Sequence, residues 1–209
     1  MMISSTIGLI AMTGVISMFA TSVKSNGDNL KRVRLNQELR AIMDVMVRDT
    51  RRAGYWRDAD GVMPNPFSTL NVSNDGSCIT YSYDFTETYD FAAPSPLDDA
   101  DNFGFRLLDD GVKYRKNSTT CGSTTDWELI SDPNAITITG LNFTLNTTCS
   151  NLTSEINTDC MANNPAPGDI LSYMYILDIT LAGELSSDNT VTYSLTDSVS
   201  IRNAVPTEN

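Results

Sequence analysis

Four cysteines are the residues of this chain whose chemistry is most readily inferred: Cys78, Cys121, Cys149 and Cys160. The chain has no histidine and no Cys-x-x-Cys spacing, so disulfides are favoured over a zinc site. Disulfides imply an oxidising compartment. Four cysteines allow three pairings. A polar loop poor in strand-forming residues separates Cys149 from Cys160 and favours a local bridge there. Cys78 would then pair with Cys121.

A second group that could do chemistry is a run of oxygen-bearing side chains of the kind that Ca²⁺ takes as ligands: Asp98, Asp99, Asp101 and Asn102. Their spacing does not match the EF-hand loop. An acidic surface loop is therefore the favoured interpretation, and no cofactor is expected.

Catalytic patterns are thin in this sequence. Without histidine, the commonest general base and the Ser-His and Cys-His pairings are absent. There is no phosphate-cradling glycine loop, no Gly-x-Ser-x-Gly and no His-Glu-x-x-His pattern. Acids are so numerous in residues 58–209 that chance carboxylate pairs are certain there. We therefore expect a protein that is not an enzyme.

Charge divides the chain into three zones. The net charge of −12 argues against nucleic-acid binding, because phosphate must be neutralised by Lys and Arg. Residues 1–23 carry no charge, and residues 24–57 hold nine bases against four acids. Residues 58–209 then hold 5 bases and 22 acids, a net charge of −17. The sequence thus has an uncharged start, a basic stem and an acidic head.

The uncharged segment 1–23 is predicted to be a transmembrane or filament-core helix. At about 1.5 Å per residue it would span roughly 34 Å, enough for a bilayer core of about 30 Å. A cleaved secretory signal is the alternative, but no basic residue precedes the segment. Small side chains let helices approach closely, and an ordinary lipid-facing anchor would not need them. The small residues expected to pack against partner helices include Ser4, Gly8, Ala11, Gly14 and Ser17.

Residues 24–54 are predicted to continue the helix as an amphipathic stem. Leu35, Leu39, Ile42 and Met46 recur at spacings of four, three and four, which indicates one apolar stripe. Basic residues followed by Gly54 are typical of a helix end. The predicted helix, 1–53, would be roughly 80 Å long, more than one head could cover. Its first half must therefore be buried in a membrane, in a bundle of partner helices, or in each in turn.

Residues 55–209 are predicted to form one β-rich head. Strand patterns occupy six segments: 79–85, 103–108, 112–116, 135–146, 171–185 and 190–202. Turn signals at 109–111 and 186–189 indicate antiparallel hairpins, not βαβ units. The predicted fold class is therefore α+β, with a long N-terminal α-helix packed against an antiparallel β-sheet head with disulfide-stapled loops.

The end of the stem resembles a known family. Residues 46–56 (MVRDTRRAGYW) look like the PilW family of minor type IV pilins, which is related to the J-type pseudopilins of type II secretion. Further matches lie at 36–38, 78–84, 102–107 and 198–203, so the resemblance covers most of the chain.

The resemblance implies a minor, tip-proximal pilin that helps to initiate pilus assembly by packing its N-terminal helix with other minor pilins and the major pilin. It places the protein in the bacterial inner membrane, with the head in the periplasm, and on the cell surface after assembly. A secretion-system pseudopilin and a membrane-anchored adhesin or binding protein are the alternatives. The family's leader, Gly-Phe processing site and mature glutamate are expected upstream of Met1.

Overall fold

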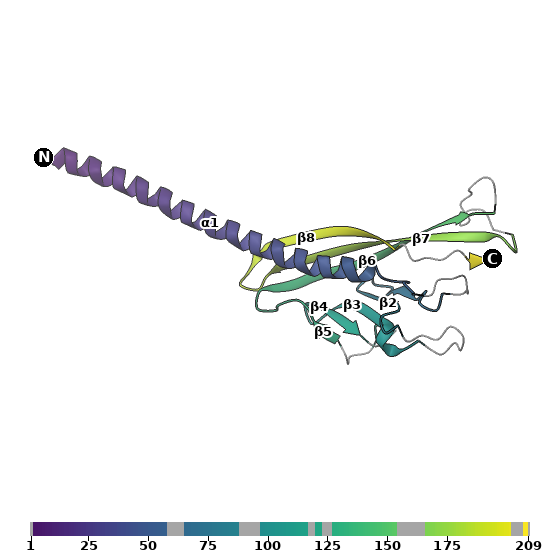
Figure 1. The fold of residues 1–209 in the computed structure, drawn as a ribbon. Helices are drawn as coiled ribbons and strands as arrows, with labels where there is room; N and C mark the ends of the chain where they lie inside the picture. Colours follow the sequence, from purple (N-terminus) through teal and green to yellow (C-terminus); the bar gives the residue numbers. More distant parts are fainter. Residues whose placement is uncertain are drawn as a thin grey trace.

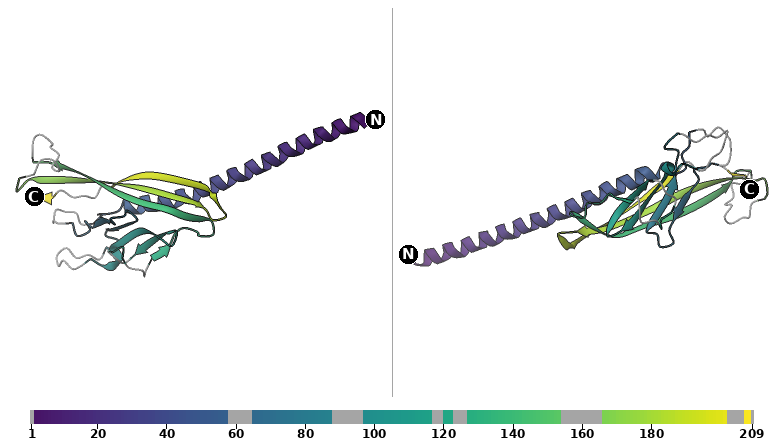
Figure 2. Two further views of the ribbon diagram at one scale, coloured as in Figure 1. Left: turned by 180° about the vertical axis from the view of Figure 1, so that it is seen from behind. Right: turned by 90° about the horizontal axis from the view of Figure 1, so that it is seen from below.

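One long helix and two antiparallel sheets make up the computed structural model of the protein (Figure 1). The residues that it describes are 2–57, 65–87, 97–116, 120–122, 127–153, 166–201 and 207–208. The N-terminal half of the helix projects away from the sheets, and its C-terminal half lies along them (Figures 1 and 2). This arrangement confirms the predicted fold class.

Helix α1 (Met2–Thr50) is continuous, as expected for a segment without proline. The chain then tightens into turns, with Arg52 N bonded to Asp49 O and Ala53 N to Thr50 O, both at 3.0 Å. Gly54 ends the run with a positive φ of 75°, which glycine adopts without steric cost. The helix therefore ends three residues before the predicted position because its last turn narrows to i→i+3 bonding.

The first sheet is an antiparallel meander in sequence order. Its strands are β1 (Leu70–Val72), β2 (Cys78–Ser82), β3 (Asn102–Leu108), β4 (Gly111–Lys116) and β5 (Trp127–Leu129). The short 3₁₀ helix η1 (Asp99–Asp101) leads into β3. Asp109 and Asp110 join β3 to β4 in a two-residue turn with φ values of 52° and 56°, the left-handed conformations that such tight hairpins require.

The second sheet has long strands in the order β6-β7-β8, namely β6 (Ile136–Asn151), β7 (Ile170–Leu185) and β8 (Asp188–Ile201). A short strand, β9 (Thr207–Glu208), pairs with the start of β7. Buried and less buried residues alternate along much of β6 and β7, so one face of the sheet is directed to the core.

The main core is one cluster to which α1 and both sheets contribute, and a small second cluster surrounds Cys149 and Leu171. Leu39 of α1, Phe105 of β3 and Ile179 of β7 are all fully buried in the main core. Strand β6 links the two sheets, because Ile138 N bonds to Asp110 O at 2.8 Å and Phe143 N to Gly76 O at 2.7 Å. The surface on which α1 packs is thus built from segments far apart in the sequence.

Five of the six predicted strand segments match β3, β4, β6, β7 and β8. Two of them differ by one residue: 135–146 starts one residue before β6, and 190–202 runs one residue past β8, into a position outside the described residues. The segment 79–85 is predicted too long, because β2 ends at Ser82. Beyond it, Tyr83 N bonds to Asp101 O at 3.1 Å and Asp84 N to Tyr55 O at 2.8 Å, so loops replace a strand partner. The three-residue strands β1 and β5 were not predicted.

Candidate functional site

The N-terminal half of α1 presents apolar side chains that the head does not cover. Those that are more than half exposed between residues 12 and 23 are Met12, Val15, Ile16, Met18, Phe19 and Val23. In the described part of the chain, no helix combines the length and the apolarity expected of a membrane span. This exposed helix surface is available to contact other molecules.

The small residues predicted to pack against partner helices lie on this projecting part of α1. Gly8 and Gly14 are exposed and have no atom within 4 Å of the position that a Cβ would take. Ser17 is also exposed, and its hydroxyl donates to the carbonyl oxygen of Gly14 at 2.9 Å. The side chains of Ser4 and Ala11 lie outside the described residues. The three described positions are therefore open to a close approach by another helix.

The stem residues Leu35, Leu39, Ile42 and Met46 have the opposite environment. All four are buried, at 0% to 5% exposure, in the core that α1 shares with the sheets. Burying each such side chain contributes roughly 1.5–3 kcal/mol relative to leaving it in water. The predicted packing residues thus divide into a projecting group and a group that fixes α1 to its own head.

A close contact at Gly183 sets the distance between α1 and strand β7. A Cβ at this position would lie 3.0 Å from the Thr137 carbonyl oxygen and 3.1 Å from Leu39 Cδ2. Only a residue without a side chain lets Leu39 sit this close to the sheet.

A half-buried carboxylate fastens the last turn of α1 to the first sheet. Asp49 accepts hydrogen bonds from the hydroxyls of Tyr81 and of Tyr83, the latter at 3.1 Å. Burial, followed by the nearby Asp49 carboxylate, raises the pKa of Tyr83 to about 12 and that of Tyr81 well above its usual value. Both phenols therefore stay protonated and act as donors at neutral pH. The sequence analysis did not predict this contact.

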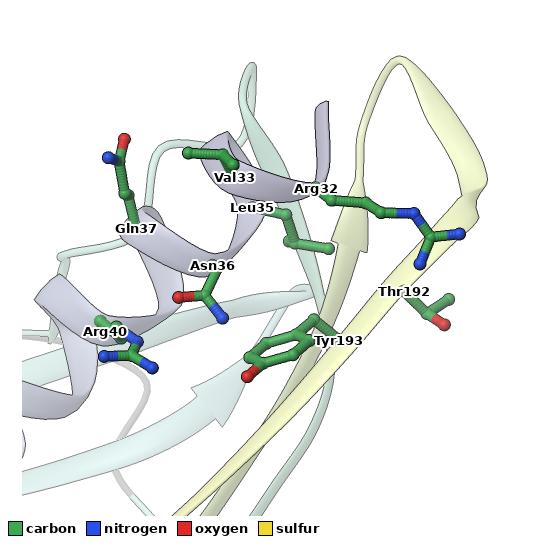
Figure 3. A pocket seen from close by; sticks show the side chains of 8 residues that line it. All are labelled: Arg32, Val33, Leu35, Asn36, Gln37, Arg40, Thr192 and Tyr193. Atoms are coloured by element: carbon green, nitrogen blue, oxygen red, sulfur yellow. The ribbon is translucent and has the colours of Figure 1, made fainter. Parts of the chain in front are cut away.

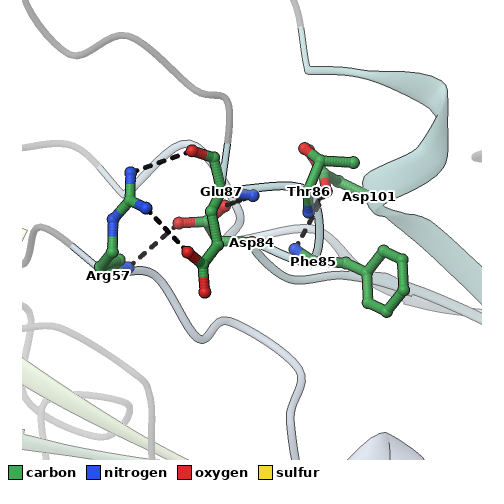
Figure 4. A network of polar contacts seen from close by, with 6 residues as sticks. All are labelled: Arg57, Asp84, Phe85, Thr86, Glu87 and Asp101. Atoms are coloured by element: carbon green, nitrogen blue, oxygen red, sulfur yellow. Dashed lines mark hydrogen bonds and ion pairs between the residues drawn. The ribbon is translucent and has the colours of Figure 1, made fainter.

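A loop network near the end of the stem also uses carboxylates as acceptors (Figure 4). Asp101 accepts from the backbone N–H groups of Phe85 and Thr86, at 3.0 and 2.9 Å. Asp84 accepts from the backbone N–H groups of Arg57, at 3.2 Å, and Glu87, at 3.0 Å. These bonds hold the segment that follows β2 in place.

The cluster considered for calcium has the same structural use. Asp101 is 1% exposed and already committed to the loop network. Asp98 caps η1 by accepting from Ala100 N at 3.0 Å, and Asn102 Nδ2 donates to the Asp98 carbonyl oxygen at 3.3 Å. Asp99 is exposed. Across the part of the chain that the structure describes, no three Cys, Asp or Glu side chains gather as a metal ion would need.

A disulfide joins Cys78 of β2 to Cys121, the expected pairing. It closes a loop of 43 residues. In the chain-entropy model, such a crosslink stabilises the folded state by about 4 kcal/mol because it lowers the conformational entropy of the unfolded chain. Cys149 is disulfide-bonded as well. Its predicted partner, Cys160, lies outside the described residues.

Comparison with known proteins identifies the family of this chain. The sequence profile described as "Prepilin peptidase-dependent protein B" matches residues 28–201, most of the chain. The chain belongs to this family. It is therefore a pilin-type protein, which confirms the broader part of the resemblance found in the sequence.

Within this family assignment, the match begins in the stem and runs through β8. No curated protein sequence matches the chain. Among solved structures, a type IV-like pilin from Thermus thermophilus is similar to 82% of this chain and 99% of its own, with 9% sequence identity and a TM-score of 0.40.

Proposed function

We propose that this protein is a minor, tip-proximal type IV pilin of the PilW type. Its role is to help initiate pilus assembly by packing its N-terminal helix among the helices of other minor pilins and of the major pilin. The observation that carries this proposal is the uncovered apolar surface of α1 between Met12 and Val23. The proposal includes no catalytic step and no cofactor.

Physical chemistry requires something to cover this surface. Leaving apolar area in water costs about 25 cal/mol per Å², and soluble monomers rarely expose contiguous apolar patches above a few hundred Å². Gly8 and Gly14 lie on the same helix and leave room for a second backbone. Before assembly the inner membrane would cover the helix, and in the filament the helices of other pilins would do so.

The packing of α1 against the head would link the head mechanically to the filament core. Force applied to the filament core would be transmitted to the head through the buried stripe from Leu35 to Met46. The hydrogen bonds of Asp49 with Tyr81 and Tyr83 would transmit it as well. The Cys78–Cys121 disulfide adds a covalent link to the loop after β4. Helix packing would supply cohesion in the filament, and the head would supply partner specificity.

Shearing of filaments from cells tests this proposal. A tagged chain should be recovered with sheared, membrane-free pili, and cells that lack the gene should make fewer pili. A strain whose type II secretion is assayed in parallel separates pilus function from secretion. If the chain stays entirely with membranes in cells that make pili, it is a membrane-anchored protein and the proposal is wrong.

A further inference from the structure

A groove lies between one flank of α1 and strand β8 (Figure 3). Its volume is about 490 Å³, and its lining residues are Arg32, Val33, Leu35, Asn36, Gln37, Arg40, Thr192 and Tyr193. Two of these residues are cations and none is an anion. In an acidic protein, this groove is a local concentration of positive charge.

Within the described ranges, the two arginines of the groove have no partner of opposite charge. Arg32 and Arg40 are exposed, and among the described residues neither makes a hydrogen bond or an ion pair. The preceding residue shows the contrast, because Lys31 Nζ pairs with Asp188 at 2.8 Å. The fold therefore neutralises a base just beside the groove and leaves both bases inside it available to an anion.

One wall of the groove is a strand with an open edge. Strand β8 pairs with β7 on one side, and no described strand pairs with it on the other. An open edge offers backbone N–H and C=O groups to an added extended segment. Tyr193 extends from this wall toward the helix, opposite Asn36 and Arg40 (Figure 3). Polar side chains on both walls suit a peptide with hydrogen-bonding groups along its length.

We propose that this groove binds an extended acidic segment from the head of an adjacent pilin-type subunit. This inference rests on the proposed function, because filament assembly brings another head beside this stem. The charges are complementary: residues 24–57 carry a net charge of +5, and residues 58–209, nearly all of the head, carry −17. Two acidic heads repel each other, whereas a basic groove on the stem attracts an acidic head. A stem-to-head contact joins two different surfaces, and such contacts propagate into open filaments.

The spacing of the arginines specifies the segment further. Arg32 and Arg40 are eight residues apart on one helix, which separates them by about 12 Å along the axis. An extended strand rises about 3.3 Å per residue and places every second side chain on the same face. Two acids four residues apart in the bound segment would therefore lie about 13 Å apart on one face and could pair with both arginines. A phospholipid head group shares the anionic chemistry but makes no use of the strand edge.

Photo-cross-linking in piliated cells tests this inference on the full chain. A photoreactive amino acid replaces Tyr193, which is 39% exposed and lines the groove. Cross-linked peptides from sheared filaments are then identified by mass spectrometry. We expect them to come from a pilin head, a second copy included, with two acids about four residues apart. Cross-links only to phospholipid, or only to helices, would overturn the inference.

Charge reversal provides the matched comparison. Arg32→Glu/Arg40→Glu should lower the cross-linking yield by about twofold to thirtyfold, as expected for the loss of two exposed charge pairs. The control Arg34→Glu/Arg51→Glu makes the same change at exposed stem positions that do not line the groove. Exchanging the two acids of the mapped segment for lysine should restore the cross-link. Equal effects of the two reversals, or no effect of the first, would overturn the inference. Absence of the unmodified chain from filaments would instead overturn the proposed function.

Discussion

Tyr81 in strand β2 donates its phenol hydrogen to the Asp49 carboxylate in the last turn of α1, and Tyr83 donates to the same carboxylate at 3.1 Å. One acid thus serves as acceptor for two aromatic residues, one in β2 and one just beyond its end. Tyr83 also stacks on Phe103 of β3 with ring centroids 4.1 Å apart. The end of the helix and the first sheet are therefore joined by polar and aromatic contacts together.

Removal of this acceptor should destabilise the head. Asp49→Ala should lower the free energy of unfolding by about 2–6 kcal/mol, because an unsatisfied buried donor costs about 1–3 kcal/mol and two donors lose their partner. Urea denaturation of the full chain in detergent, followed by tyrosine fluorescence, measures the change. Asp44→Ala is the control, since Asp44 is an exposed acid on the same helix. Equal stability of the two variants would show that the contact contributes nothing.

Alkaline pH should weaken the same contact. The unfolded pKa of tyrosine is about 10, and burial beside Asp49 raises the pKa of Tyr83 to about 12. The native state therefore binds the Tyr83 phenol proton more tightly than the unfolded state does. The resulting contribution to the free energy of unfolding is fully present below pH 10 and is lost as pH rises through 12. Urea midpoints at pH 8, 10 and 11 should fall in that order. Tyr83→Phe should make the fall shallower, and an unchanged slope would contradict the assignment.

Thiol chemistry should report a fully oxidised head. Cys78, Cys121 and Cys149 are all disulfide-bonded, so titration of the denatured chain without reductant should find no reactive thiol. The double variant Cys78→Ser/Cys121→Ser should lose about 4 kcal/mol of stability, the loop-closure term for this bridge. Two or more reactive thiols in protein purified from cells would argue against an oxidising compartment.

Gly183 and Gly140 provide a matched pair for the packing of α1 on the sheet. Gly183→Val should destabilise the head by about 1–3 kcal/mol, because its Cβ would lie 3.1 Å from Leu39 Cδ2 and 3.0 Å from a backbone oxygen that cannot move aside. At Gly140 the nearest atom, Ala182 Cβ, would lie at an ordinary 3.7 Å. Gly140→Val should therefore cost clearly less. Similar thermal midpoints for both variants would show that the close contact at Gly183 does not determine how α1 packs on the sheet.

Local patterns in the sequence predict much of this fold. The stripe from Leu35 to Met46 identifies the buried face of α1, because helical periodicity follows from backbone geometry alone. Alternation similarly identifies the long strands β7 and β8. Three-residue strands such as β1 are too short to show a period, and their pairing depends on neighbours that are distant in sequence.

The contacts of the site were less predictable for the same reason. The charge pattern of the stem shows Arg32 and Arg40 as bases, but the second wall of their groove comes from Tyr193, more than 150 positions later in the chain. The acceptor role of Asp49 depends equally on Tyr81 in a distant strand. Such contacts follow from the packing of the helix on the sheets, which no local pattern specifies.

The small residues of the projecting helix should be essential for assembly but not for folding. Gly8 and Gly14 touch nothing in the head, so Gly8→Leu/Gly14→Leu should leave the thermal midpoint of the head unchanged. In a filament core, however, the added side chains would meet packed neighbouring helices, and overpacking costs typically about 1–3 kcal/mol per site. Lipid adapts to side-chain size, so membrane association should be unchanged or stronger.

The control Met12→Leu/Met18→Leu changes exposed positions of the same helix with little change in volume. We expect the glycine variant to be depleted from sheared pili and the methionine variant to be incorporated normally. If both variants enter pili at wild-type levels, close helix packing is not how this protein joins a filament.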